Sequence, residues 1–375
     1  MTAAPERALA RIDLGAIERN CAHLKSLLTG GARLCAVVKA DGYGHGDVWC
    51  ARAALEGGAD WLAVATAAEA EELRRHGIRA RILVMGALTR EDARVALAAA
   101  ADVVAWDERF VALLEEIARA DDIRAGVHVK LDTGMGRLGA RDEATARSVA
   151  QAVDDADRLE LSGAMTHFAT ADQPGDDHFD HQLERFTPFA DGLRRGRKDL
   201  LVHAANSAGT YRDERAHFGM VRCGIAIYGL DPFHEDPGER GLEPALRLES
   251  YVAAVRRFEP GESAGYGRRW RAERPTWVGT LPIGYGDGWR RGLTNNGEVL
   301  VRGGRYPLVG TVSMDNITID LGPETNVQPG DRATLIGDDG GERILCEDVA
   351  RRLETINYEI TCGLSPRVRR VHHHA

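Results

Sequence analysis

A lysine between an apolar run and a glycine-rich segment is the first candidate for chemistry in this sequence. Lys39 follows the run LCAVV and precedes ADGYGHG. Among the 48 lysines and arginines only four are lysines, namely Lys25, Lys39, Lys130 and Lys198. Arginine can carry charge equally well, but only a lysine amine can lose its proton and form a Schiff base. Because burial lowers the pKa of an amine, Lys39 is predicted to form one; an ordinary solvent-exposed lysine is the alternative.

Polar residues that could bind a phosphate group follow later apolar segments. His167 follows LSGAMT, Asn206 and Ser207 end LVHAANS, and Arg222, Gly224 and Ile225 lie in MVRCGIAIYG. Taken singly, these residues fit ordinary roles: a core histidine, a helix cap, a member of a buried ion pair. Taken together, a hydroxyl beside backbone amides is typical of a phosphate site at the end of a barrel. A lysine Schiff base facing such a site indicates pyridoxal phosphate.

The segment LDTGMGRLG allows a different interpretation. Gly134, Gly136 and Gly139 have the G-x-G-x-x-G spacing of dinucleotide-binding loops, and Asp154 and Asp155 follow about twenty positions later. These carboxylates precede the next predicted strand rather than ending it, and the motif comes after four other strands. An NAD-dependent oxidoreductase is therefore the weaker interpretation.

Three motifs and a late tyrosine stand out in the last third of the chain. The motifs are SAGYG (263–267), GYGDG (284–288) and SMDN (313–316). Tyr266 lies between two glycines, and Tyr358 lies in INYEI. A turn aromatic and a core tyrosine are the structural alternatives for these two side chains.

The elements that must position these residues alternate along the first 230 positions. Amphipathic helical patterns separate eight apolar, strand-like segments, at 34–40, 61–66, 80–86, 102–106, 126–133, 161–168, 201–207 and 220–229. Nearly continuous apolar strands separated by helices are typical of a parallel sheet covered on both faces. Eight such units predict a closed (β/α)8 barrel over residues 12–238, with the candidate residues where the strands end.

The pattern of alternating strand-like and helical segments ends near residue 240. A polar segment with proline and glycine, FHEDPGERGLEP, is followed by short alternating segments that predict a mainly β domain over 239–375. Asn295-Asn296-Gly297 and Gly303-Gly304 are predicted hairpin turns. One helix, CEDVARRLE, is expected among the strands.

Composition excludes several classes of protein. The net charge of −9 argues against a nucleic-acid partner, and no apolar run is long enough to predict a membrane span. Six scattered cysteines without paired spacing are read as free thiols of a reducing compartment, and no metal site is predicted. With no apolar segment near the N-terminus, a cytoplasmic location is expected.

The ordered set of motifs resembles the alanine racemases, which are fold-type III pyridoxal-phosphate enzymes. The resemblance spans nearly the whole chain and rests on AVVKADGYGHG, LDTGMGRLG, THFATAD, AANSAG, VRCGIAIYG, AGYG, GYGDG, SMD and INYE. It implies a (β/α)8 barrel and a β domain that also takes in residues 1–11. It further implies a head-to-tail homodimer in which the β domain of one subunit completes the site of the other.

The resemblance also implies a two-base mechanism. Lys39 matches the lysine bonded to the cofactor, and Tyr266, from the partner subunit, matches the second acid/base. Racemisation needs two, because the Cα proton leaves one face and returns on the other, beyond the reach of one rigid base. His167 is expected beside this tyrosine and linked to Arg222, where it could stabilise the phenolate. Arg222 is expected to face the pyridine nitrogen without giving up a proton.

Further roles come from the same resemblance. Cofactor contacts, mainly to the phosphate, are implied for Tyr43, His167, Asn206, Ser207, Arg222, Gly224, Ile225 and Tyr358. Arg137 and the Met314 backbone amide match substrate-carboxylate ligands, with Asp315 in the same loop. Lys130 matches a lysine that is carbamylated in many members, and a carbamate would turn a like-charge pair with Arg137 into an attractive one.

The resemblance implies an enzyme that interconverts L- and D-alanine and supplies D-alanine for peptidoglycan. Thr311 and Ser313 depart from the common pattern of arginine and cysteine, which puts the access route and side-chain selectivity in question. A serine or broader-specificity racemase is therefore the first alternative. A non-catalytic pyridoxal-phosphate carrier is a second, although such proteins resemble the barrel alone.

Overall fold

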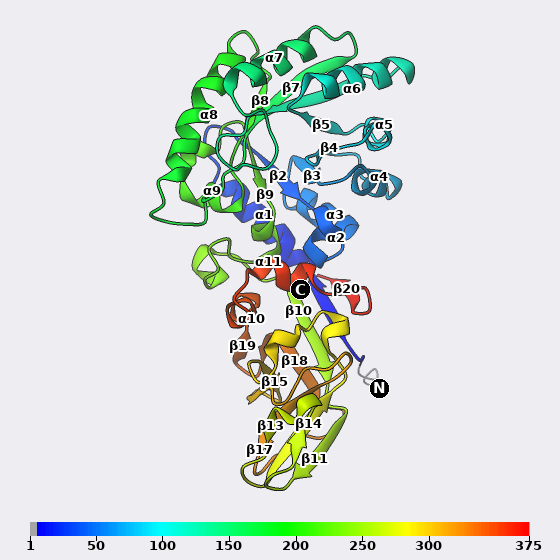
Figure 1. The fold of residues 1–375 in the computed structure, drawn as a ribbon, viewed down its shortest axis with the longest axis vertical. Coiled ribbons are helices and arrows are strands. Elements are labelled where there is room, and N and C mark those ends of the chain that lie inside the picture. The colour runs from blue at the N-terminus through cyan, green and yellow to red at the C-terminus, as the bar shows by residue number, and fades with distance from the viewer. Residues whose placement is uncertain (1–5, 375) are drawn as a thin grey trace. The chain divides into compact units, whose positions relative to one another are not determined.

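Eight parallel strands close into a barrel in the first of two compact units formed by the chain (Figure 1). This computed structural model describes residues 6–374. The barrel unit spans Ile17–Ile227, and the second unit combines the segment up to Ala16 with the chain from Tyr228 onwards. Each barrel strand pairs with the next, and β9 pairs with β2. The strands are β2 (Arg33–Val37), β3 (Trp61–Val64), β4 (Arg81–Val84), β5 (Asp102–Ala105), β6 (Ala125–Lys130), β7 (Leu159–Met165), β8 (Leu201–His203) and β9 (Met220–Cys223).

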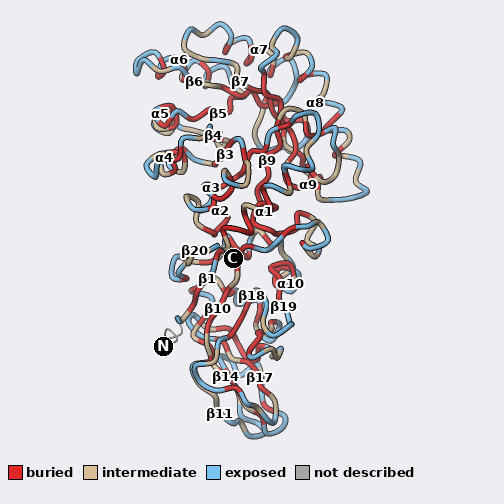
Figure 2. Tube along the Cα trace, turned by 180° about the vertical axis from the view of Figure 1, so that it is seen from behind, coloured by how far each residue is buried: buried red, intermediate tan, exposed pale blue. Residues whose placement is uncertain are grey.

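Helices surround the barrel and connect its strands. They are α1 (Leu14–Ser26), α2 (Lys39–Gly44), α3 (Asp47–Glu56), α4 (Ala67–Arg75), α5 (Arg90–Ala98), α6 (Glu108–Ala120), α7 (Glu143–Asp154), α8 (His178–Arg194) and α9 (Ser207–Arg212). Polar caps start several of them: Thr66 and Glu69 form a capping box at α4, and Thr89 and Asp92 form another at α5. The strands are buried while the outer helix faces are exposed (Figure 2), as expected for a parallel sheet covered by helices.

The (β/α)8 prediction is confirmed, and the predicted strands differ from the observed ones mainly at their carboxyl ends. The segment 34–40 was expected to run through Lys39, yet β2 ends at Val37. Likewise, β7 ends at Met165 before His167, β8 ends at His203 before Asn206, and β9 ends at Cys223. The apolar pattern continues past these four strands because the residue directly after each of them is buried as well.

The second unit is mainly β, as predicted. Its largest sheet has seven strands in the order β16-β15-β18-β10-β1-β20, with β19 on β18. These are β1 (Leu9–Asp13), β10 (Leu246–Tyr251), β15 (Glu298–Val301), β16 (Gly304–Pro307), β18 (Arg332–Asp339), β19 (Glu342–Ile344) and β20 (Arg369–His373). β1 pairs with β10 antiparallel and with β20 parallel, so the N-terminal segment is part of this unit.

Smaller sheets and two helices complete this unit. β11 (Ala254–Phe258), β14 (Thr276–Leu281) and β17 (Ile317–Gly322) form one sheet, and β12 (Ser263–Ala264) pairs with β13 (Trp270–Arg271). The predicted helix is α10 (Cys346–Arg352), whereas α11 (Asn357–Cys362) was not predicted. Arg302 and Gly303 make the turn between β15 and β16 with φ of 53° and 77°, close to the predicted Gly303-Gly304 turn. The predicted hairpin at Asn295–Gly297 is wrong, because a single helical turn (Arg291–Leu293) precedes it instead of a strand.

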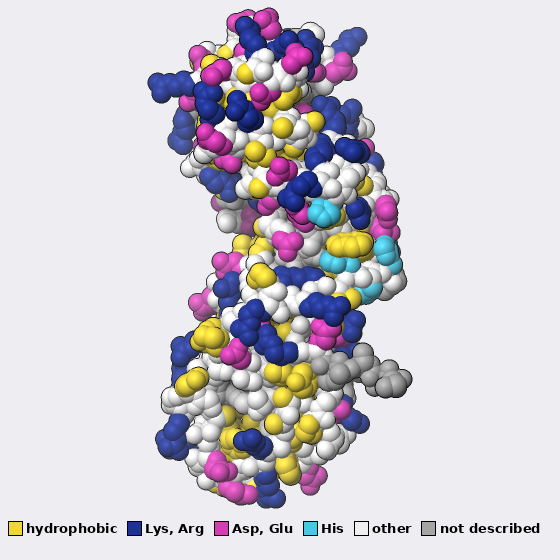
Figure 3. All heavy atoms as spheres, turned by 90° about the vertical axis from the view of Figure 1, so that its right-hand side faces the viewer, with side chains coloured by type: hydrophobic (Ala, Val, Ile, Leu, Met, Phe, Trp, Pro, Cys, Tyr) yellow, Lys and Arg dark blue, Asp and Glu magenta, His cyan; other side chains and the backbone are white. Residues whose placement is uncertain are grey.

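The surface of the described residues carries both signs of charge. Figure 3 shows Lys and Arg side chains intermingled with Asp and Glu on the visible face of each unit. No helix among residues 6–374 is long and apolar enough to cross a membrane.

Candidate active site

Lys39 lies at the start of a strained turn that directly follows β2. The next four residues, Ala40 to Tyr43, all have φ between 53° and 58°, so the chain makes a left-handed helical turn although three of the four are not glycine. This conformation costs roughly 1–2 kcal/mol per non-glycine residue. The Ala40 amide donates to Glu69 Oε1 at 2.7 Å, and the Gly42 amide donates to Val38 O at 3.0 Å. Strain held in this way is concentrated between two predicted site residues, Lys39 and Tyr43.

Ser207, Gly224 and Tyr43 converge at the carboxyl ends of neighbouring strands. The Gly224 amide donates to Ser207 Oγ at 3.0 Å, and Ser207 begins α9, whose N-cap Asn206 accepts from the Gly209 amide at 2.9 Å. A Cβ atom at position 224 would lie 2.3 Å from the Tyr43 hydroxyl oxygen. Position 224 therefore requires glycine, because two hydroxyl groups and backbone N–H groups approach each other there. Ile225, the next residue, is fully buried.

Arg222 is buried in β9 and anchored by backbone carbonyls. Its Nη2 donates to Thr166 O and Ala204 O, each at 3.0 Å, and lies 3.1 Å from His167 Nδ1. Burial lowers the pKa of Arg222 to about 10, below the range expected from sequence, yet the group stays protonated at neutral pH. Burial and then the charge of Arg222 hold the pKa of His167 well below 6.5, so His167 is a neutral imidazole.

Lys130 is a buried amine among cations. It ends β6, and its pKa is lowered to about 8 by burial, then by the charges of Arg222 and Arg137, with Asp132 partly opposing them. Arg137 is exposed in the loop after β6. The like-charge conflict expected from the sequence is thus present around an unmodified Lys130.

Backbone amides of the LDTGMGRLG loop donate hydrogen bonds to a carboxylate of the same loop. Asp132 Oδ1 accepts from the Gly134 amide at 3.0 Å and from the Gly136 amide at 3.1 Å. All three glycines have positive φ, and α7 begins only at Glu143. Asp154 and Asp155 lie at the end of α7, before β7, as the sequence indicated. Amides already bonded to a carboxylate do not offer the anion site that a dinucleotide needs, which argues against the oxidoreductase interpretation.

The remaining predicted residues lie in the second unit. Tyr266 starts a single helical turn (Tyr266–Arg268) and is 73% exposed, beside a surface cavity of about 380 Å³. Its carbonyl accepts from Thr311 Oγ1 at 2.7 Å, and Gly265, with φ 73°, packs so closely that a Cβ would lie 2.8 Å from the Thr311 amide nitrogen. Thr311 is buried, so this position, expected at the access route, supports the backbone of Tyr266.

The loop that carries Met314 rests on the GYGDG motif. The Tyr285 amide donates to Ser313 O at 3.0 Å and the Gly286 amide to Met314 O at 2.9 Å. Met314 is 52% exposed. The Ser313 hydroxyl donates to Asn316 O at 2.7 Å, which closes the loop on itself.

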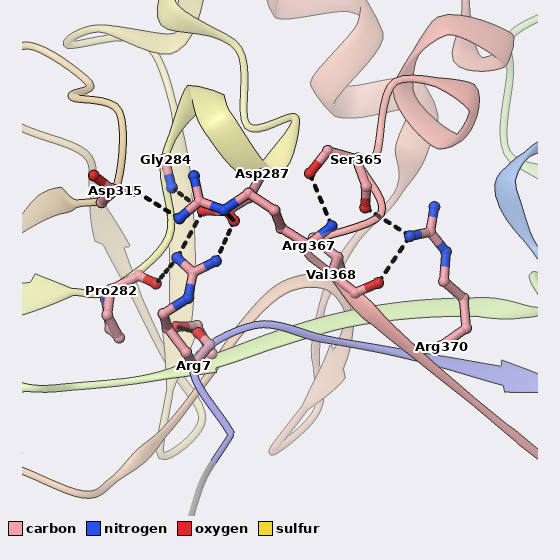
Figure 4. Close-up of polar contacts among 10 residues, drawn as sticks. Arg7, Pro282, Gly284, Asp287, Asp315, Ser365, Arg367, Val368 and Arg370 are labelled. Atoms are coloured by element: carbon pink, nitrogen blue, oxygen red, sulfur yellow. Dashed lines mark hydrogen bonds and ion pairs between the residues drawn. The ribbon is translucent and has the colours of Figure 1, made fainter.

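An ion-pair network that the sequence analysis missed fixes the same loop (Figure 4). Arg367 donates to Asp315 Oδ1 at 2.6 Å and lies 3.6 Å from Asp287, the acidic residue of GYGDG. Arg7 donates to Asp287 and to Pro282 O. The only sequence signal was the carboxylate within a glycine motif, since the arginines come from opposite ends of the chain.

Tyr358 lies in α11 with its ring centroid 6.3 Å from that of His234. The helix is held by Asn357, whose Nδ2 donates to Asp231 O and to Glu347 Oε1, each at 2.8 Å. The predicted site residues therefore form two groups. The barrel unit gathers those from Lys39 to Ile225, and the second unit contains Tyr266, Met314 and Tyr358.

Comparisons with known proteins agree over nearly the whole chain. Residues 12–232 match the family described as alanine racemase, N-terminal domain, and residues 245–372 match alanine racemase, C-terminal domain. The sequence is 42% identical over 362 residues to an alanine racemase of Symbiobacterium thermophilum, covering 96% of each chain. It is 44% identical over 374 residues to one of Geobacillus kaustophilus, covering 96% of this chain and 93% of that one.

Solved structures show the same likeness. An alanine racemase from D-cycloserine-producing Streptomyces lavendulae superposes with a TM-score of 0.93 at 35% identity, covering 99% of this chain and 98% of that one. The alanine racemase of Bacillus anthracis with bound L-Ala-P superposes with a TM-score of 0.90 at 38% identity, covering 98% of this chain and 95% of that one.

Proposed function

The chain belongs to the alanine racemase family, and from this premise we propose that it interconverts L- and D-alanine with pyridoxal phosphate bound in its barrel. The observation that carries the proposal is the convergence of Tyr43, Ser207 and Gly224 beside the strand that leads to Lys39. A reactive amine and a phosphate site at one end of a barrel are what this cofactor requires.

The residues present fit the cofactor. Ser207 and Tyr43 supply hydroxyl donors, and Ile225 supplies a backbone amide. The Gly224 amide donates to Ser207 Oγ and so leaves the Ser207 hydroxyl proton for the phosphate, and the glycine at 224 keeps the cradle free of a Cβ. Tyr358 and Asn206 are the further cofactor contacts in the proposal. When bound, pyridoxal phosphate withdraws electrons from the amino acid attached to it and so makes the Cα proton labile.

Two bases on opposite faces of the substrate would move the proton. Lys39 holds or accepts it on the face used by D-alanine, and Tyr266 of the partner subunit does so on the face used by L-alanine. The 73% exposure of Tyr266 in the isolated chain supports a role in a homodimer with shared sites. His167, neutral beside Arg222, can donate from Nε2 to a tyrosine phenolate and favour it.

Arg222 is the proposed partner of the pyridine nitrogen. A guanidinium only donates, and with a pKa of about 10 it keeps its own protons at neutral pH, so the ring nitrogen stays unprotonated. An unprotonated ring is a weaker electron sink, which limits side reactions such as transamination.

Arg137 and the Met314 amide would hold the substrate carboxylate. The Lys130 amine, with its pKa lowered to about 8, offers more of the neutral form that reacts with carbon dioxide than an ordinary lysine does. The resulting carbamate would orient Arg137. A cytoplasmic location and supply of D-alanine for peptidoglycan complete the proposal.

Exchange of the Cα proton tests the function directly. Purified holoenzyme in deuterium oxide, given a panel of L-amino acids, is expected to incorporate deuterium into alanine and to form D-alanine. Its visible absorption band should disappear with borohydride and be absent in Lys39→Ala. No exchange with alanine, or the lack of any band after incubation with pyridoxal phosphate, would refute the proposal. Faster exchange with serine would instead support the broader-specificity alternative.

A further inference from the structure

A line of hydrogen bonds runs through the barrel from Arg222 to the opposite end. Arg222 Nη1 lies 2.9 Å from His203 Nδ1, and His203 Nε2 lies 2.8 Å from His128 Nδ1. His128 Nε2 lies 3.2 Å from Asp102 Oδ2, which also accepts from Arg81 at 3.2 Å. Asp102 and Arg81 begin β5 and β4, whereas Arg222 lies toward the end of β9.

Only one arrangement of protons satisfies every member of this line. Arg222 has no acceptor, so His203 Nδ1 must accept and its proton lies on Nε2. His203 then donates to His128 Nδ1, which leaves the proton of His128 on Nε2 to be donated to Asp102. Both imidazoles are neutral, and burial together with the charge of Arg222 keeps the pKa of His203 well below 6.5. The direction of each bond is set by the arginine at one end and the carboxylate at the other.

The barrel makes room for this line at two glycines. A Cβ at Gly163 would lie 2.3 Å from His128 Nδ1, and a Cβ at Gly126 would lie 2.6 Å from the Asp102 carboxyl group. The β6–β7 register also shifts between Val127 and His128. His128 and His203 are completely buried, and the Trp61 ring packs edge-on against His128. A buried polar network is stabilising only when every member is hydrogen-bonded. The complete bonding of His128 and His203, and the two glycines that make room for the line, therefore indicate that the barrel is built to hold it.

We propose that Asp102, His128 and His203 form a positioning relay that fixes the orientation of the Arg222 guanidinium, and through it the hydrogen bond that Arg222 makes to its ligand. The effect on the bond between Arg222 and its ligand rests on the function proposed above. The hydrogen bonds that join Asp102, His128, His203 and Arg222 involve protein atoms only. Its far end lies near solvent, where the Arg81 side chain is 56% exposed.

The first test determines which ring nitrogen of His128 and of His203 carries the proton in the wild-type holoenzyme. Nitrogen-15 NMR of histidine-labelled protein at pH 8, assigned with single substitutions, is expected to show His128 and His203 as neutral Nε2–H tautomers. A protonated ring, or an Nδ1–H tautomer at either position, would overturn the relay. This result does not depend on turnover, so it stays informative if the proposed function fails.

The second test compares His128→Gln with His128→Leu. A glutamine amide can accept from His203 and donate to Asp102, whereas leucine can do neither. His128→Leu is expected to shift the absorption band of the bound cofactor and its pH profile and to lower kcat about tenfold, with a smaller change in KM. His128→Gln should recover most of these properties. Equal behaviour of the two variants, or an unchanged spectrum in both, would refute the relay.

Matched controls separate positioning from general damage to the barrel. His217 is another buried histidine of the barrel unit, bonded to Thr210 O at 2.9 Å, and Asp60 accepts from the Leu34 amide at the same end of the barrel as Asp102. His217→Leu and Asp60→Asn should reduce stability without moving the cofactor spectrum. If His128→Leu does not fold, Asp102→Leu, which removes the acceptor for His128 Nε2, replaces it. A spectrum of Asp102→Leu identical to that of wild type would then contradict the proposal.

Discussion

The Nη2 atom of Arg222 lies 3.1 Å from the Nδ1 atom of His167, and this contact decides where the proton of His167 is held. Because the guanidinium can only donate, Nδ1 accepts and the imidazole proton lies on Nε2. Arg222 thus orients two imidazoles, His167 through Nη2 and His203 through Nη1. Arg222, which would face the cofactor ring, therefore also sets the tautomer of His167, the histidine expected to assist Tyr266.

Mixed dimers should show whether Tyr266 acts across subunits. Lys39→Ala and Tyr266→Phe are each expected to be inactive as homodimers. After mixing and re-equilibration, activity should return to about a quarter of wild type, because about half of the dimers are hybrids and each hybrid has one intact site. Activity is measured by D-alanine formation. If Tyr266 served its own chain, every site would carry one defect and no activity would return.

Lys130→Met should weaken binding of the substrate carboxylate. If Lys130 is a carbamate that orients Arg137, the variant loses a charged hydrogen bond, and KM for alanine should rise about tenfold or more with a smaller change in kcat. Carbon-13 NMR with labelled bicarbonate should show a carbamate signal in wild type and none in the variant. The exposed pair Lys25–Asp60 supplies the control, Lys25→Met. A more stable variant with unchanged KM would mean instead that Lys130 is an unmodified buried cation.

Gly224→Ala should lose cofactor while the barrel still folds. The added Cβ would lie 2.3 Å from the Tyr43 hydroxyl oxygen, so that hydroxyl must leave the proposed phosphate cradle. Losing one hydrogen bond to a charged group corresponds to about a tenfold or greater rise in the Kd for pyridoxal phosphate. Spectroscopic titration of cofactor-stripped protein measures it. Gly219→Ala, whose Cβ would meet nothing closer than 3.3 Å, is the matched control and should bind normally.

Asp287→Asn should destabilise the second unit. Burial opposes ionisation of Asp287, but hydrogen bonds from Arg7 and the Gly284 amide outweigh it, so its pKa lies below the usual value. The variant is expected to lose about 2–3 kcal/mol at pH 7, measured by denaturant unfolding. Asp315→Asn, at an exposed pair with Arg367, should cost about 0.2–1 kcal/mol.

The difference in stability between wild type and Asp287→Asn should depend on pH, because the pKa of Asp287 is lowered in the folded state. A carboxyl group with a depressed pKa in the folded state contributes its full stability above its unfolded pKa and loses it as the pH falls through the folded value. The gap between wild type and Asp287→Asn should therefore be constant above about pH 5 and narrow below about pH 4. A gap that does not change with pH would show that the effect comes from shape rather than charge.

The sequence by itself determined the barrel, the mainly β second unit and the residues to examine. Strand and helix patterns depend on neighbours a few positions apart, so the apolar runs were sufficient to locate all eight barrel strands. The positions where those strands end were less certain, because buried apolar residues continue past the last strand residue, as Val38 does after β2 and Ala204 and Ala205 do after β8. The left-handed turn from Ala40 to Tyr43 carries only one glycine and had no local signal.

Only the tertiary structure decided how those residues act on one another. Arg222 meets His167 from 55 positions away, and His128 meets His203 from 75, because closing the barrel brings their strands together. The lowered pKa of Lys130 likewise depends on burial and on charges from distant segments. Arg7 and Arg367 approach Asp287 from the two ends of the chain. Hydrogen bonds and electrostatic interactions depend on distance in space, and a pattern along the chain records only separation in sequence.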